Sequence, residues 1–257
     1  MSASTRGGAW FEKLTAGGKP VAGLPPSVLA SDATIDGHAV RVLAVVPDPH
    51  ARFVRARNGE VGIDEGFGLA RAIRDTPHDS AILAIVDVPG QAFGTREEAV
   101  GLQRALAASA DAYIRARRGG RPVLALVVGK AISGAFLAHG LQAGWIGALD
   151  DDFIEVHVMS EPAVARVTRM EREDLARVAR EVPATARDIR SFASFGAIDE
   201  IFPANAETAT IVAAIAAALR DGRGLRDPIE RLGRPQAQAT RAIARRVREE
   251  LQAQWDG

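Results

Sequence analysis

The segment from Arg121 to Gly144 constrains the fold most, because an apolar run in it stops at a glycine and restarts as a run of small residues. Val123 to Val128 is a continuous β-favouring run without polar alternation, which is typical of a strand covered on both faces. Gly129 predicts the end of this strand. Gly134 and Ala135 predict the start of a helix that a ligand can approach closely. The first turn of such a helix has unpaired N–H groups, which suit an anion or a developing oxyanion.

A second segment of the same design lies upstream. Ile82 to Val88 is another apolar run, Gly90 follows it in a turn, and Gly94 precedes a helix predicted over residues 97–117. The repeated order of strand and helix predicts an α/β fold with both strands in one parallel sheet. Because the carboxyl ends of parallel strands lie at one edge of a sheet, we expect the two turns to form the active site there.

Composition and charge exclude several classes of protein. The 257 residues include 32 basic and 32 acidic ones, so no overall field attracts nucleic acid or an anionic membrane. The chain has no cysteine, which removes disulfides, thiolate chemistry and cysteine-ligated metals. No apolar run approaches a membrane span, and no export signal is visible at the N-terminus. We therefore expect a cytoplasmic protein that binds neither nucleic acid nor membrane.

Three parts are expected along the chain. Residues 1–36 are rich in small residues and proline and predict an extended N-terminal arm. Residues 37–222 contain the repeated strands and helices and predict an α/β domain. Residues 223–257 predict a helical C-terminal extension with a basic last helix.

The glycines of the two turns have two explanations. They permit close packing of helix on strand, or they expose backbone amides as an oxyanion hole. In the second case, amides near Gly90 and Gln91, or near Gly134 and Ala135, would hold a thioester oxygen while it becomes an enolate. We take these four positions as the candidate catalytic residues.

Five neighbouring positions are expected to contact the substrate. Lys130 does not belong to a phosphate-binding loop, because no Gly-x-x-x-x-Gly-Lys precedes it and Ala131 replaces the usual Ser or Thr. It is either a surface lysine or a contact for an anionic tail such as phosphopantetheine. No spacing of histidines and carboxylates predicts a metal site. The candidate substrate-binding residues are Phe93, Gly94, Gly129, Lys130 and Ser133.

Ser133 has two interpretations of its own. It is placed to cap the helix that it opens. It is also a possible nucleophile, since Ser133, His157 and an aspartate would supply the residue types of a catalytic triad. The Gly-x-Ser-x-Gly elbow is absent, because alanines stand at positions 131 and 135.

The sequence at the two turns resembles a known family. IVDVPGQAFGTREEAVGL is similar to the Asp-x-Pro-Gly segment of acyl-CoA carboxyltransferases, and PVLALVVGKAISGAFLAHG is similar to their second oxyanion turn. Among these proteins the chain most resembles the gamma subunits of biotin-independent malonate decarboxylases. The resemblance runs from about residue 20 to about residue 220 and includes VMSEPAVARVTRM. Ser133 departs from it, since the family commonly has glycine there.

The resemblance implies a crotonase-like ββα superhelix of the carboxyltransferase C-half type over residues 37–222. It implies a lyase that is active in a hetero-oligomer with a beta subunit, alongside an acyl carrier protein subunit and its transferase. The reaction would convert malonyl-S-acyl carrier protein to acetyl-S-acyl carrier protein and CO2. The substrate would be carried on a phosphoribosyl-dephospho-CoA arm, with no cofactor bound directly by this chain and no biotin.

Three other functions remain open at this point. GKAISGAFLAHG also resembles the serine-bearing segment of the Clp protease proteolytic subunit, which would make the chain a peptidase using Ser133 and His157. A biotin-dependent malonyl-thioester carboxyltransferase subunit would pass CO2 to biotin. A non-catalytic half of a hetero-oligomer would tolerate substitution at Gly134 without loss of turnover.

Overall fold

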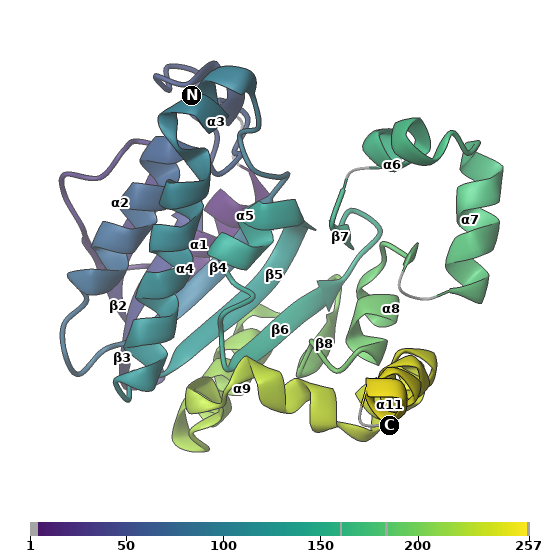
Figure 1. The fold of residues 1–257 in the computed structure, drawn as a ribbon. Helices are drawn as coiled ribbons and strands as arrows, with labels where there is room; N and C mark the ends of the chain where they lie inside the picture. Colours follow the sequence, from purple (N-terminus) through teal and green to yellow (C-terminus); the bar gives the residue numbers. More distant parts are fainter. Residues whose placement is uncertain (1–4, 160, 183–184, 256–257) are drawn as a thin grey trace.

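A mixed β-sheet forms the centre of the molecule (Figure 1). The computed structural model describes residues 5–159, 161–182 and 185–255. Within these residues the strand order is β1-β2-β3-β4-β5-β6-β8, and β7 pairs with the end of β5. The first three strands are antiparallel neighbours, and the pairs from β3 to β8 are parallel. The strands are β1 (Lys19–Pro20), β2 (Val28–Ile35), β3 (His38–Val45), β4 (Ala81–Val88), β5 (Val123–Ile132), β6 (Trp145–Asp150), β7 (Val156–His157) and β8 (Glu200–Pro203).

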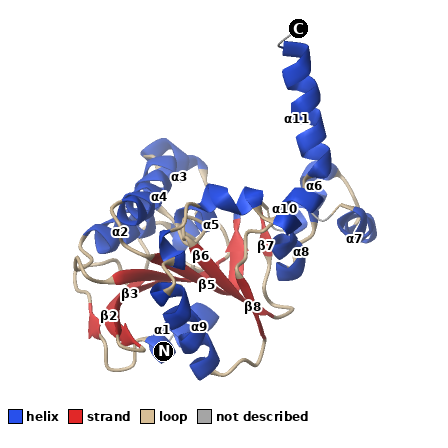
Figure 2. Ribbon diagram, turned by 90° about the horizontal axis from the view of Figure 1, so that it is seen from below, coloured by secondary structure: helices blue, strands red, loops and turns tan. Residues whose placement is uncertain are grey.

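Helices cover both faces of the sheet. In Figure 2, α1 and α9 lie on one face and α2, α3, α4 and α5 on the other, while α11 projects away from the body. The helices α6 and α7 stand apart from the sheet, beyond β7 (Figure 1). The α-helices are α1 (Arg6–Leu14), α2 (Ile63–Arg74), α3 (Thr95–Val100), α4 (Leu102–Arg118), α5 (Ser133–Ala138), α6 (Glu161–Thr168), α7 (Arg172–Glu181), α8 (Ile189–Ser194), α9 (Thr208–Arg220), α10 (Pro235–Thr240) and α11 (Ala242–Trp255). The short 3₁₀ helices are η1 (Val54–Ala56), η3 (Arg223–Leu225) and η4 (Pro228–Gly233).

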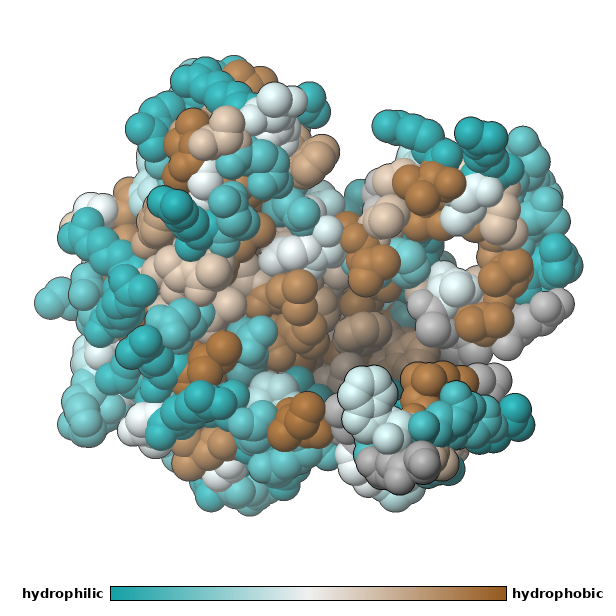
Figure 3. Space-filling model, in the orientation of Figure 1, coloured by the Kyte–Doolittle hydropathy of each residue, from teal (hydrophilic) through white to brown (hydrophobic). Residues whose placement is uncertain are grey.

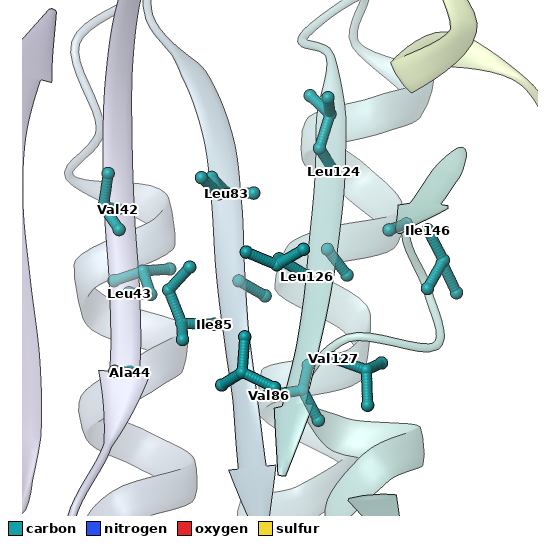
Figure 4. Close-up of a cluster of buried hydrophobic side chains, with 14 of the residues drawn as sticks. Val42, Leu43, Ala44, Leu83, Ile85, Val86, Leu124, Leu126, Val127 and Ile146 are labelled. Atoms are coloured by element: carbon teal, nitrogen blue, oxygen red, sulfur yellow. The ribbon is translucent and has the colours of Figure 1, made fainter. Parts of the chain in front are cut away.

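The core lies between the central strands and the helices on both sides (Figure 4). Ile85 and Val86 of β4, and Leu126 and Val127 of β5, are completely buried, although adjacent residues in a strand point to opposite faces. Each such side chain contributes about 1.5–3 kcal/mol by leaving water. The prediction of central strands covered on both faces is therefore confirmed.

The beginning of the chain differs from the extended arm predicted over residues 1–36. Residues 1–4 lie outside the described part; the residues that follow form α1, which contacts β3, β4 and β5, and then β1 and β2. Strand β2 pairs with β3 over eight residues, so a boundary at residue 36 would divide a hairpin. Trp10 and Leu14 of α1 are buried. The segment is thus part of the central fold.

Two other boundaries differ from their predictions. The helix predicted over residues 97–117 is interrupted at Gly101, whose φ of +110° lies in the left-handed region, so α3 and α4 are separate. Strand β5 does not end at Gly129 but continues to Ile132. The C-terminal part predicted as helical contains η3, η4, α10 and α11; residues 256–257 lie outside the described part.

None of the described helices is both long and apolar enough to cross a membrane.

Candidate active site

The two predicted turns lie side by side at the carboxyl edge of the sheet. Strands β4 and β5 are parallel neighbours, and their pairing ends at Val88 and Ala131. The register shifts between Val86 and Val88, so the pairing is irregular just before the strands end. The turn with Gly90 follows β4, and α5 follows β5 directly. The prediction that the two turns meet at one edge is confirmed.

The turn after β4 presents two unused backbone donors. Gly90 is buried and has a φ of +146°, a conformation that favours glycine. Its carbonyl accepts the N–H of Val61 at 3.0 Å, and the N–H of Ala92 donates to the Val61 carbonyl at 3.0 Å. These bonds hold the backbone on both sides of Gln91. The N–H groups of Gly90 and Gln91 donate to no acceptor within residues 5–159, 161–182 and 185–255.

The turn at the start of α5 is linked to the first turn by a side chain. The N–H of Gly134 donates to Oε1 of Gln91 at 2.8 Å. Ala135 is buried, and its position in the first turn leaves its amide without a partner four residues earlier in the helix. Ser133, which opens the helix, has a φ of +61°, a strained value for a residue with a side chain.

Gly129 and Lys130 are held by a carboxylate of β4. Oδ1 of Asp87 accepts the N–H of Lys130 at 3.1 Å, and Oδ2 accepts the N–H of Gly7 at 3.0 Å. A Cβ at position 129 would lie 2.0 Å from Oδ1, so only glycine leaves room for this carboxylate. The Lys130 side chain is exposed and borders a cavity of about 300 Å³ together with Arg6. Gly129 and Lys130 therefore lie apart from the apolar cavity beside α5.

That apolar cavity has a volume of about 450 Å³ and opens between α5, β7 and α8. Figure 3 shows hydrophobic residues gathered in a hollow at this place. Its polar contributions come from Ser133, His157 and the backbone, and none of its lining residues is Asp, Glu, Lys or Arg. The lining residues are Ala131, Ser133, Gly134, Phe136, Leu137, Leu141, Val156, His157, Val158, Ala186, Phe192 and Phe195.

Ser133 and His157 line one cavity without forming a triad. Nδ1 of His157 lies 3.1 Å from the amide nitrogen and 3.0 Å from the carbonyl oxygen of Met159. No carboxylate in the described part of the chain forms a hydrogen bond with this imidazole or with the Ser133 hydroxyl. Burial, and then the nearby charge of Arg187, lower the pKa of His157. The third group that orients the base in a serine hydrolase is thus not in place.

Two predicted substrate contacts lie away from this cavity. Phe93 is 65% exposed on the segment before α3. Gly94 precedes the first residue of α3, and a Cβ there would lie 2.3 Å from Oε2 of Glu97. The absence of a side chain at Gly94 therefore leaves room for the side chain of Glu97 in α3. Among the predicted substrate contacts, the structure places Ser133 in the apolar cavity, and Gly129 and Lys130 in the cavity that Arg6 borders.

A buried pair behind α5 was not expected from the sequence. His139 follows the last residue of α5 and is completely buried. Its Nε2 lies 2.9 Å from the carbonyl oxygen of Ile85, so Nε2 carries the proton, and the hydroxyl of Tyr113 donates to Nδ1 at 2.9 Å. Burial lowers the pKa of His139 to about 4 and raises the pKa of Tyr113. The neutral imidazole holds the end of α5 against β4 and α4.

The chain is similar to known carboxyltransferases in fold. It aligns with transcarboxylase 12S, solved with hydrolysed methylmalonyl-coenzyme A, at a TM-score of 0.65 and 22% identity, over 82% of this chain and 40% of that one. This likeness confirms the predicted crotonase-like fold of the carboxyltransferases, a sheet of largely parallel strands with helices.

Proteins of higher sequence identity to this chain indicate its family more closely. A Pseudomonas malonate decarboxylase hetero-tetramer, solved with coenzyme A, contains a chain 47% identical to this one; the match covers 96% of this chain and 100% of that one, at a TM-score of 0.85. The malonyl-S-ACP:biotin-protein carboxyltransferase of Malonomonas rubra is 35% identical over 160 residues. That match covers 58% of this chain and 55% of the relative, so the chain spans about half the length of that curated relative.

The family model described as malonate decarboxylase gamma subunit matches residues 56–255, which is most of the chain and includes both turns of the candidate site. The chain belongs to the malonate decarboxylase gamma subunit family.

Proposed function

We propose that this chain, with a beta subunit, decarboxylates a malonyl thioester carried by an acyl carrier protein. The bond between the methylene carbon and the carboxylate breaks, CO2 leaves, and the electron pair forms an enolate whose negative charge rests on the thioester oxygen. A proton added at the methylene carbon then gives the acetyl thioester. The hardest requirement is to stabilise the enolate oxygen, which backbone N–H groups do without a nucleophile.

The observation that carries this proposal is the pair of unused amides at Gly90 and Gln91, next to the start of α5. Buried backbone N–H groups are rarely left without an acceptor, so the buried turn at Gly90 is suited to a ligand oxygen. Ala135 supplies a donor from the other turn. The amide of Gly134, in contrast, is engaged by Gln91.

The apolar cavity supports loss of CO2 in a second way. A malonyl carboxylate placed there meets Phe136, Phe192 and Phe195, and no Lys or Arg is among the lining residues. The imidazole of His157 also lines the cavity, and burial lowers its pKa, which favours the neutral form. Decarboxylation spreads the carboxylate charge into the enolate, and an apolar environment disfavours the localised charge of the starting state. The cavity then favours departure of CO2 rather than tight binding of the carboxylate.

The carrier arm would approach the sheet edge from the side on which Lys130 and Arg6 lie. We propose that Lys130 and Arg6, which border the cavity of about 300 Å³, contact phosphate groups of a phosphoribosyl-dephospho-CoA arm. The chain would then bind no cofactor of its own and need no biotin. A carrier protein and its transferase, acting in the cytoplasm, complete this proposal.

A beta subunit would cover the open side of the apolar cavity. Leu137 and Val158, which line this cavity, are 52% and 70% exposed, and Phe153 and Phe93 near the sheet edge are also largely exposed. Exposed apolar groups around a cavity mark an interaction surface. The hetero-tetrameric state of the similar Pseudomonas decarboxylase supports the same arrangement.

Release of CO2 from a malonyl thioester tests the proposal. The chain is assayed alone and then as the complex that purifies with it from its native cells. We expect release from the complex, insensitive to avidin, and little from the isolated chain. Absence of release from both preparations, with labelling of Ser133 by a fluorophosphonate, would overturn the proposal in favour of a hydrolase.

A biotin-dependent carboxyltransferase is the second candidate. The 35% identity to the Malonomonas rubra malonyl-S-ACP:biotin-protein carboxyltransferase favours it. In that case CO2 would pass to biotin, and avidin would abolish turnover of the complex.

A further inference from the structure

We propose that the side chain of Gln91 is a positioning residue, which sets the separation between the two turns of the site by accepting the N–H of Gly134. This inference rests on the proposed decarboxylation, because it concerns the geometry in which the amides of these turns meet the enolate oxygen. It assigns a role to the carboxamide of Gln91 that is separate from the backbone N–H of the same residue.

The bond from Gly134 to Gln91 is a unique link between the two turns. Residues 89–94 and 133–138 are described throughout, and between these two segments the 2.8 Å contact is the sole hydrogen bond. The backbone pairing of β4 and β5 has already ended at Val88 and Ala131. Beyond that point, the strands no longer fix the distance between the turns.

The pairing of β4 and β5 is also irregular just before the strands end. The carboxylate of Asp87 occupies the place where a side chain at position 129 would lie, and the register shift falls at the same level. A parallel ladder that is interrupted here transmits less restraint to the turns. A hydrogen bond between the two turns is therefore needed to fix their separation in a site that uses amides of both turns.

Gln91 is well suited to this task because its backbone is fixed. The two hydrogen bonds with Val61 hold the residues on either side of it. Gly134 provides the complementary space, since a Cβ there would lie 3.1 Å from Oε1 and 3.4 Å from Cδ of Gln91. Because Gly134 donates an N–H, the group that faces it is the carboxamide oxygen.

The helix that Gln91 restrains cannot hold its own orientation. Helix α5 has six residues, fewer than an isolated helix needs to persist. Its end is fixed by His139 through Ile85 and Tyr113, and its beginning by Gln91. Loss of the Gln91 contact removes the hydrogen bond that ties this beginning to the turn at Gly90. A shift of about 1 Å at such a site costs up to about a hundredfold in rate.

The test compares three variants in the assembled decarboxylase complex. Gln91→Met keeps the length of the side chain but removes the acceptor, and Gln91→Glu keeps an acceptor. Gln103→Met is the matched control, because Gln103 is an exposed glutamine on α4 that forms no hydrogen bond with residues 89–94 or 133–138. Kinetics with a malonyl thioester give kcat and KM, and hydrogen–deuterium exchange reports the amides of residues 133–139.

We expect Gln91→Met to lower kcat by about tenfold or more, with KM within about twofold, and to speed exchange at the start of α5. Gln91→Glu should keep the slow exchange and retain more of kcat than Gln91→Met, and Gln103→Met should change neither readout. Unchanged exchange in Gln91→Met would overturn the link itself. Faster exchange with unchanged kcat in Gln91→Met would overturn the role of the Gln91 side chain in positioning. Absence of decarboxylation by the unmodified complex would instead refute the proposed function, and the exchange data would still report on the link.

Discussion

The hydroxyl of Tyr113 donates to Nδ1 of His139 across 2.9 Å, inside a part of the core from which both side chains exclude water. With Nε2 bound to the Ile85 carbonyl, the imidazole has a partner at each nitrogen and is neutral. This pair makes the stability of the fold depend on pH.

Stability is expected to fall as the pH drops from 7 to 5. Burial lowers the pKa of His139 to about 4 in the folded protein, against an ordinary value of 6.5. Between these values the unfolded chain binds the proton and the folded one does not, so acid favours unfolding. The contribution of His139 between pH 7 and pH 5 is about 2 kcal/mol. Urea unfolding at both pH values measures it, and His139→Gln should remove most of this difference; an unaltered difference would contradict the prediction.

Removal of the Tyr113 hydroxyl should destabilise the fold without changing the net charge of the protein. Tyr113→Phe leaves Nδ1 of His139 buried without a donor, which costs about 1–3 kcal/mol. Urea unfolding at pH 7 checks this value. If the variant were as stable as the parent, the hydrogen bond would have no net stabilising effect.

Ser133 is expected to be dispensable for decarboxylation. Ser133→Ala removes the hydroxyl and should leave CO2 release by the complex in place, because the proposed reaction needs no nucleophile. Loss of a nucleophile typically costs more than about a thousandfold in kcat. A decrease of that size in CO2 release by Ser133→Ala would contradict the prediction, because the reaction would then need the Ser133 hydroxyl.

Glycine at the same position should stabilise the fold. The φ of Ser133 is +61°, which glycine adopts without strain. We expect Ser133→Gly to raise the free energy of unfolding by about 0.5–1 kcal/mol. Urea unfolding beside Ser133→Ala, which keeps the strained backbone, separates the effect of φ from that of the hydroxyl.

Gly129 should tolerate no side chain. In Gly129→Ala the added carbon would meet Oδ1 of Asp87 at 2.0 Å, so the carboxylate must leave the amides of Gly7 and Lys130. We expect a loss of about 2–3 kcal/mol in urea unfolding. Gly233→Ala is the control, because no atom lies within 4 Å of the added carbon there and its cost should stay within about 0.5 kcal/mol.

The fold and the place of the site were predictable because they depend on local patterns. The apolar runs 82–88 and 123–128 have no polar alternation, and each is followed by a glycine and a helix, so the parallel strands and adjacent turns follow. The family, that of the malonate decarboxylase gamma subunits, was indicated by the resemblance of the same turns and is confirmed. The assignment of individual amides to the enolate stays a prediction.

The contacts that shape the site were not predictable, because each joins distant positions. Gln91 meets Gly134 43 residues later, Tyr113 meets His139 26 residues later, and Gly7 meets Asp87 80 residues later. No periodicity in one segment encodes its partner in another. These contacts became visible only with the structure.

Helix α1 was missed for a related reason. Two of its residues are glycines, which weaken helix propensity and favour the interpretation as an arm. The structure shows why at least one is needed: a Cβ at Gly7 would lie 2.9 Å from Cβ of Asp87. Tertiary contact with β4 thus outweighs the local preference of the chain.

The hydrogen bond from Gly7 to Asp87 also affects when helix α1 can dock during synthesis of the chain. Helix α1 is made 80 residues before the carboxylate that holds it, and it packs on β5, which is made later still. The nascent chain therefore covers the apolar side of α1 only in part, with β2 and β3, until β4 and β5 have left the ribosome. Complete docking of the first helix and pairing of the two central strands are then linked late steps of folding, and this non-local closure is expected to be slow.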